Sequence, residues 1–193
     1  MIDALRYEGL RIRTIATTYW ILVLGLVLCA LVALGLGIDT RGADLPPAAA
    51  TLLLTAGGGD IPFAVLGLTV SLIGILSTGH EYRYGTILPT LTAIPRRSLL
   101  LGAKVLVVAA VSAVAAVASI ALCWLVGSIA RGELLPVTAA PVPIVLVGHV
   151  ILVTLYGVLG VALGQLTRSI PVALVIVLSP LWWSSRSSRL CPD

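Results

Sequence analysis

Charged residues are scarce in this chain, and their scarcity excludes a soluble globular protein. Asp, Glu, Lys and Arg account for 10% of the 193 residues, whereas hydrophobic residues account for 59%. Soluble domains carry roughly 25% charged residues. Apolar segments of about 20 residues recur along the chain, and this is the length that a helix needs to cross a bilayer. The sequence therefore predicts an integral membrane protein.

The motifs of several enzyme classes are also missing. There is no phosphate-binding loop, because Val105 follows Lys104 where that motif has Ser or Thr. Neither HExxH nor GxSxG occurs in the chain. These absences argue against a nucleotide hydrolase, a zinc protease and a serine hydrolase. We expect no catalytic residue and no cofactor.

Cysteine and histidine do not form a recognisable metal site. Cys29, Cys123 and Cys191 have no metal-ligand spacing and no CxxC pair. The first two lie inside apolar segments and are expected to be small buried hydrophobic residues. His80 and His149 are assigned to opposite sides of the membrane, so they are not a pair. We expect His149 to be packed or interfacial, and we expect no bound metal.

The expected spans carry no Asp, Glu, Lys or Arg near their middles. Ion-driven carriers usually need such a group to hold the coupling ion. If this protein moves a solute, the energy then enters elsewhere. The polar groups within the spans are neutral, and two interpretations remain open. They line a pathway for an apolar or amphiphilic solute, or they satisfy backbone groups of their own or a neighbouring helix. These residues include Ser71, Ser112, Ser119, Thr154 and Tyr156.

The fold class expected is all-α, a polytopic helical membrane protein. An amphipathic elbow helix is expected at residues 1–18, where apolar and basic residues separate at helical spacing. Four full transmembrane helices and a partial fifth should follow. The expected spans are 19–38, 61–78, 105–129 and 144–166, with the partial span at 170–183. The last of these would cover only about 21 Å.

The connection from Asp39 to Asp60 is rich in Gly and Pro, which argues against a further full span. Its middle, residues 48–56, is compatible with a short interfacial helix. Small residues recur at helical spacing in the second expected span and are suited to close helix packing. They are Gly67, Ser71, Gly74 and Thr78. The pair Gly160 and Gly164 in the fourth expected span is a second packing motif, although a weak one.

The basic residues predict the orientation. Numbering the sides by alternation places most of them on one side, which the positive-inside rule assigns to the cytoplasm. The N-terminus is then cytoplasmic, in the inner (plasma) membrane of the cell. The membrane-interface anchors expected on this side are Arg6, Arg11, Arg13, Lys104 and Arg168. Because topology explains these charges, the net charge of +4 does not indicate binding to nucleic acid.

The longest polar interruption runs over residues 79–104 and is expected to be a cytoplasmic loop. Its charges and its broken backbone could not be satisfied in lipid. Thr86 can cap a short helix that Pro95 ends, and this helix would lie along the membrane between two spans. Such a helix can transmit a movement of a soluble partner to both flanking spans. The alternative is a plain positive-inside loop without a partner.

The residues of this loop resemble the intracellular signature of ABC exporter permeases of the type-2 class. In that family an E-[FY]-R-x-G-T run closes the second span, as Glu81 to Thr86 would here. A T-L-x-x-x-P-x-R run follows, as Thr90 to Arg97 would here, and then a lysine opens the third span, as Lys104 would. The amphipathic N-terminus similarly resembles the elbow helix of the family, and the resemblance extends from Met1 to about Leu178.

The resemblance implies the membrane subunit of an ATP-driven exporter. A separate ABC-type ATPase subunit would dock on the helix from Thr86 to Ile94 and would carry out ATP hydrolysis. The permease would pair with a second copy or with a related permease, in a homodimer or a heterodimer. The positions assigned to the coupling region are Glu81, Tyr82, Arg83, Gly85, Thr86, Leu91, Pro95, Arg96 and Arg97.

The C-terminal part departs from this family. The family has six spans, so the permease domain expected at 1–183 stops within the fifth. At Ser184 the composition changes from aliphatic residues to Ser and Arg, and residues 184–193 are expected to be an aberrant polar tail. We interpret the change as a frameshift or premature end near 178–183, with a naturally short subunit as the other possibility. The alternative functions are a non-transporting scaffold or accessory subunit, and a non-functional truncated product.

Overall fold

Every regular element of the described chain is a helix. The computed structural model describes residues 16–57, 65–83, 97–138, 140–167 and 169–179. The helices are α2 (Ala16–Asp39), α3 (Pro47–Leu54), α4 (Val65–Arg83), α6 (Arg97–Arg131) and α7 (Val142–Thr167), followed by a short helix at Ile170–Ser179. The expected all-α class is confirmed for these residues.

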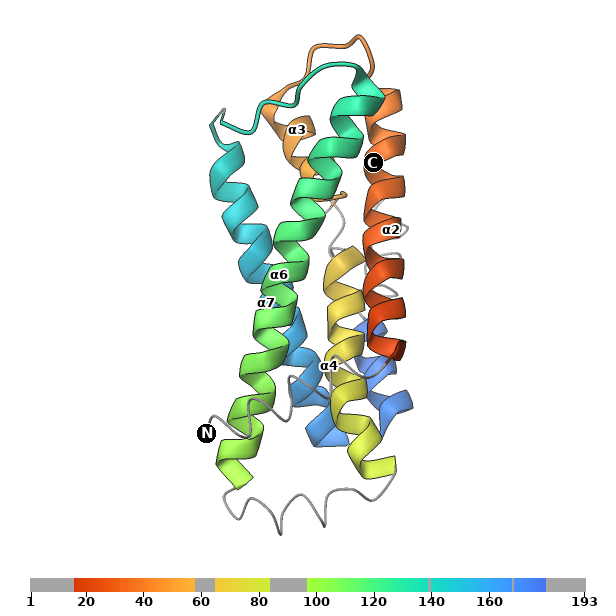
Figure 1. The fold of residues 1–193 in the computed structure, drawn as a ribbon, viewed down its shortest axis with the longest axis vertical. Helices are drawn as coiled ribbons and strands as arrows, with labels where there is room; N and C mark the ends of the chain where they lie inside the picture. Colours follow the sequence, from red (N-terminus) through yellow and green to blue (C-terminus); the bar gives the residue numbers. More distant parts are fainter. Residues whose placement is uncertain (1–15, 58–64, 84–96, 139, 168, 180–193) are drawn as a thin grey trace, which may run out of the picture.

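The long helices alternate in direction along one bundle (Figure 1). α2 and α6 run one way, and α4 and α7 run the other way. The beginnings of α2 and α6 therefore lie at the same end as the last turns of α4 and α7. We call this the motif end, because α4 and α6 flank residues 84–96 there. The opposite end, which holds Asp39, Arg131 and Val142, is called the far end.

Three helices are long and apolar enough to cross a membrane. They are Thr17–Asp39, Leu101–Arg131 and Val142–Thr167. These helices fit a membrane protein and correspond to three of the four expected full spans. The apolar part of α4, Val65–Thr78, is shorter, and so is Ile170–Ser179. Four full spans are therefore not confirmed as single helices.

The short helix α3 lies within the bundle, whereas the sequence suggested an interfacial helix over 48–56. It begins after Pro46, whose backbone is extended, with Pro47 in its first turn. It ends where Ala56 adopts a left-handed conformation (φ 51) and the Gly57 amide donates to the Leu52 carbonyl at 2.7 Å. Its apolar residues are buried against α2, α6 and α7. A helix with one fully apolar side gains more from this burial than from lying at a surface.

α3 and α4 occupy successive levels between the same helices. Near the far end, a Cβ on Gly127 of α6 would meet the Leu53 side chain of α3 at 2.6 Å. Nearer the motif end, a Cβ on Gly25 of α2 would meet the Thr69 hydroxyl of α4 at 2.6 Å. Figure 1 accordingly shows α3 above the beginning of α4. α3 and α4 thus pack along α2, α6 and α7 as two successive helices.

The helices α4 and α6 extend into the stretch expected as a loop, residues 79–104. α4 continues to Arg83, and α6 begins at Arg97. Sequence reasoning set the helix ends where hydrophobicity fell. Backbone hydrogen bonds continue into the polar residues, because a helix satisfies its own peptide groups inside or outside lipid.

The small residues of α4 and α7 pack against each other. Their spacing predicted close helix packing but did not identify the partner helix. A Cβ on Gly74 would lie 2.6 Å from the Gly157 carbonyl oxygen. A Cβ on Gly160 would overlap the carbonyl oxygen of Ser71, and one on Gly164 would lie 3.1 Å from Cβ of Thr78. The two backbones can approach this closely only because these positions lack side chains. This pair makes the most extensive contact between helices in the described part of the chain.

The hydroxyl groups within the helices bond backward to carbonyls of their own helix. Ser112 donates to the Val108 carbonyl at 2.8 Å, and Ser119 donates to the Ala116 carbonyl at 2.8 Å. Ser71 and Thr154 do the same, and so do further Ser and Thr residues of α3, α4 and α7. Of the two interpretations left open by the sequence, these bonds favour backbone satisfaction.

Candidate functional site

Among the residues described at the motif end of the bundle, Lys104 is a deeply buried cation. Its side chain is 1% exposed and is the largest fully buried side chain of the described residues. Its Nζ donates to the Ser77 carbonyl of α4 at 3.4 Å. The sequence predicts Lys104 to be a membrane-interface anchor, and in the structure its side chain lies between α6 and α4. A buried cation is costly unless it is paired, so the residues around Lys104 must hold it.

Most residues of the proposed coupling region lie outside the described part of the chain. The backbone of α4 includes Glu81, Tyr82 and Arg83, and α6 begins with Arg97, but their side chains are not described. The remaining positions are not described at all: Gly85, Thr86, Leu91, Pro95 and Arg96. The same holds for residues 1–15 of the elbow helix expected at 1–18, with Arg6, Arg11 and Arg13, for Arg168, and for residues 180–193. The structure does bring motif positions 81–83, in the last turn of α4, and position 97, the first residue of α6, to the same end of the bundle.

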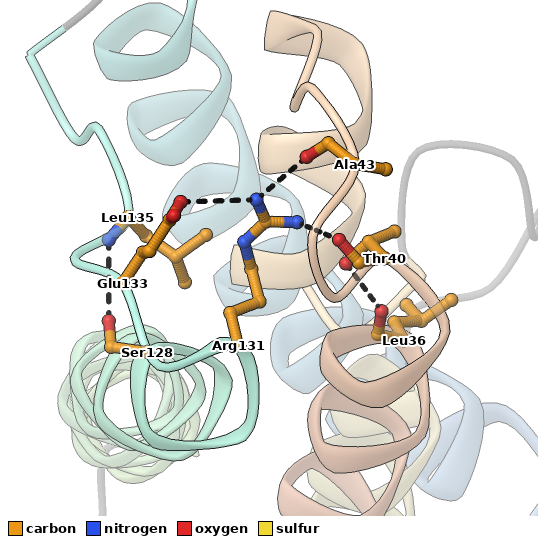
Figure 2. A network of polar contacts seen from close by, with 7 residues as sticks. All are labelled: Leu36, Thr40, Ala43, Ser128, Arg131, Glu133 and Leu135. Atoms are coloured by element: carbon orange, nitrogen blue, oxygen red, sulfur yellow. Dashed lines mark hydrogen bonds and ion pairs between the residues drawn. The ribbon is translucent and has the colours of Figure 1, made fainter.

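A second buried cation, Arg131, ends α6 at the far end (Figure 2). Arg131 is 7% exposed. Its guanidinium donates hydrogen bonds to the Thr40 and Ala43 carbonyls of the turn after α2, the second at 3.1 Å. Its Nη2 also lies 3.7 Å from Oε2 of Glu133, whose side chain is 75% exposed. Arg131 therefore holds the end of α2 to the end of α6.

The turn around Arg131 is supported by further hydrogen bonds. The Ser128 hydroxyl accepts from the Leu135 amide at 3.4 Å, as Figure 2 shows. The indole of Trp124 donates to the Leu135 carbonyl at 3.3 Å. Gly132 has φ 78, and its amide donates to the Ser128 carbonyl at 2.9 Å, which ends α6. The segment after α6 is thereby folded back on the helix.

The two buried cations mark opposite ends of one helix. Lys104 and Arg131 both belong to α6, and at 1.5 Å per residue they stand about 40 Å apart. A bilayer with its interfacial regions is roughly 40–45 Å thick. The spacing is comparable with this thickness, and α6 carries only uncharged residues between the two cations.

Cys29, Cys123 and His149 are all buried within the helical bundle. Cys29 and Cys123 are free and buried, and the Cys123 thiol donates to the Cys29 carbonyl at 3.7 Å. The expectation of small buried residues is confirmed for these two, whereas Cys191 lies outside the described residues. His149 is 7% exposed and is therefore packed. No group of three or more His, Cys, Asp or Glu side chains comes together among the described residues.

Sequence reasoning missed two features of this site. It read Lys104 and Arg131 as topology signals, although both also hold helices together. It also missed a row of small residues on α2 that packs inward, namely Gly25, Cys29, Ala33 and Gly37. A Cβ on Gly37 would lie 2.7 Å from the Ala130 side chain of α6. The four-residue spacing of this row was the available signal.

Comparisons of the chain with protein-family models, with curated proteins and with solved structures find no match. The function therefore has to be argued from the residues and from their arrangement.

Proposed function

We propose that this chain is the membrane subunit of an ATP-driven exporter, with ATP hydrolysis on a separate ATPase subunit. The observation that carries the proposal is the ordered run of residues from Glu81 to Lys104, which resembles the coupling signature of type-2 ABC exporter permeases. The flanking helices agree with a coupling role. α4 ends at Arg83 and α6 begins at Arg97, so a partner bound between these residues would act on two long helices at once.

The membrane topology in this proposal has four passages. α2, α6 and α7 each cross the bilayer, and α3 with α4 together form the remaining passage as a broken helix. Neither piece is long enough alone, because the eight residues of α3 cover about 12 Å and the apolar part of α4 covers about 21 Å. Broken helices are tolerated at membrane depth where protein surrounds them. α3 meets this condition, since α2, α6 and α7 enclose it.

The motif end faces the cytoplasm of the plasma membrane in this proposal. α2 begins at the same end at which α4 ends and α6 begins (Figure 1). The basic residues before α2 and those between α4 and α6 therefore belong to the same side of the membrane. The positive-inside rule assigns that side to the cytoplasm, where a soluble ATPase and its ATP are found.

The solute pathway is proposed to lie between two permease subunits, either two copies or one copy and a relative. Within one chain, the small residues of α4 and α7 bring the two backbones into contact and leave no room for a solute between them. The hydroxyl groups of the helices are engaged by their own carbonyls. The helices also present large exposed apolar side chains on their outer faces, which lipid or a second subunit would cover.

The test is co-purification of an ATPase subunit and its stimulation by the permease. In lipid nanodiscs, the wild-type chain should bind the ATPase and raise its rate of hydrolysis. The double substitution Glu81→Ala with Arg83→Ala should weaken binding, stimulation or both, because it removes two charges of the coupling region. The matched control is Arg41→Ala with Glu133→Ala, which removes two charges near the far end and should change neither.

Two results would contradict the proposal. Unchanged binding and stimulation in the Glu81 and Arg83 variant would remove the coupling assignment. Failure of the wild-type chain to bind any ATPase would favour a non-transporting accessory membrane protein.

A further inference from the structure

Lys104 connects the two helices that flank the motif. It is buried between α6 and α4, and its ammonium donates to the Ser77 carbonyl. Ser77 stands six residues before Arg83, the last residue of α4, and Lys104 stands seven residues after Arg97, the first residue of α6. The contact therefore lies about 10 Å inside the bundle, measured from the helix ends that would meet a partner.

Elsewhere near the motif end, α4 has little direct contact with α6. α4 packs chiefly on α7, through the small residues described above, and α6 packs chiefly on α2 and α7. The direct contact between α4 and α6 is one of the smallest between helices in the described chain. A charged hydrogen bond to a carbonyl is stronger than a neutral one. Lys104 therefore adds a charged contact between two helices that otherwise touch little over the described residues.

We propose that Lys104 is a positioning residue that couples α6 to α4, so that a displacement at the motif end moves both helices together. The inference rests on the proposed function and deepens it, since it names the residue that passes the ATPase's movement into the bundle. Without this link, a force applied at the motif end would displace α4 and α6 relative to each other. α7, which packs on both helices, would then receive two different movements.

The matched control for Lys104 is Arg131. Both are basic, nearly fully buried residues of α6 that donate to backbone carbonyls of another helix or its turn. They differ in place, because Arg131 lies at the far end and holds α2. Lys104→Met and Arg131→Met each replace a buried cation with an unbranched apolar side chain. A general loss of packing would affect both variants, whereas loss of coupling would affect Lys104→Met alone.

The first experiment does not need the ATPase. Spin labels on Leu76 of α4 and Leu106 of α6 report the distance between these helices in nanodiscs by pulsed dipolar spectroscopy. Lys104→Met should broaden the distance distribution and shift its mean, whereas Arg131→Met should leave it unchanged and Lys104→Arg should restore it in part. Only monodisperse protein is measured, so an unfolded variant is removed before the comparison. An unchanged distribution in Lys104→Met, or equal changes in both Met variants, would overturn the inference.

The second experiment uses the ATPase that co-purifies with the wild-type chain. Lys104→Met should retain ATPase binding but lose stimulation by about fivefold or more, the usual scale of coupling between sites, while Arg131→Met changes stimulation by less than about twofold. Equal losses in the two variants would contradict the inference and leave the proposed function standing. Absence of binding and stimulation in the wild-type chain would instead contradict the proposed function, and the spin-label result would still decide whether Lys104 links the helices.

Discussion

Backbone carbonyls are the main partners of the buried polar side chains in this protein. Lys104 and Arg131 donate to carbonyls of other segments, and the hydroxyl groups of Ser112 and Thr154 donate to carbonyls of their own helices. A carbonyl has two lone pairs, so it can accept a side-chain donor while it also accepts the helical amide. A buried donor in an apolar bundle can thus be satisfied by a backbone carbonyl.

The contact of Gly160 with Ser71 leads to a stability prediction. Gly160→Ala would place a methyl group against the Ser71 backbone, which cannot rotate away, so α4 and α7 must separate. We expect a loss of about 1–3 kcal/mol in the free energy of unfolding, as overpacking usually costs. The control is Gly148→Ala on the same helix, where an added Cβ meets nothing within 4 Å. Unfolding in mixed micelles measures both, and equal stabilities would contradict the packing of α4 on α7.

At the scale of elements, α3 shows how a short helix becomes part of a membrane bundle. Eight residues are too few for an isolated helix to be stable in water. α3 is stabilised instead by Ala50, Leu53 and Leu54, each with an exposed fraction of 0%. Its prolines and its left-handed end fix where it starts and stops. Because it fills the far end between α2, α6 and α7, α4 need not extend to that end.

Truncation of a buried α3 side chain tests this role. Leu53→Ala would leave a cavity beside Gly127 of α6, where the side chains of Leu53 and Leu135 both lie. We expect it to lower the free energy of unfolding by about 2–5 kcal/mol, as buried Leu→Ala substitutions do. Leu134→Ala is the control, since Leu134 is 78% exposed and should change stability little. A small effect of Leu53→Ala would place α3 outside the packed bundle, as a surface helix.

At the scale of the whole molecule, α6 is the helix around which the bundle is built. It contacts α2, α3, α4 and α7, and it extends from Arg97 to Arg131. A buried cation near each end holds it to a different neighbour, to α4 at the motif end and to the turn after α2 at the far end.

The proposed orientation makes a labelling prediction for the two ends. Cys191 is first replaced by Ser, and Cys29 and Cys123 are kept because they are buried. A membrane-impermeant maleimide should label Glu133→Cys on intact cells, because Glu133 is exposed at the far end. Thr17→Cys lies at the motif end and should be labelled only after the membrane is opened. The reverse pattern would invert the orientation, and labelling of both on intact cells would contradict a membrane-spanning α2.

The sequence alone was enough to predict the all-α class and three helices that are long and apolar enough to cross a membrane. It also indicated that the small residues of α4 and α7 are suited to close packing. These features follow from apolar length and from spacing along one helix, which are local properties. The exporter proposal also comes from the sequence, through the motif between Glu81 and Lys104.

Three other features could be seen only once the helices were packed together. They are the burial of α3, the position of the Lys104 side chain between α4 and α6, and the hydrogen bonds from Arg131 to the turn after α2. Each depends on residues far apart in the chain. A basic residue beside an apolar run looks the same in sequence whether it faces headgroups or carbonyls of another helix. An apolar octapeptide likewise looks the same on a surface or inside a bundle. The choice is made by the neighbouring helices, which bury the side chain and supply its hydrogen-bond acceptors.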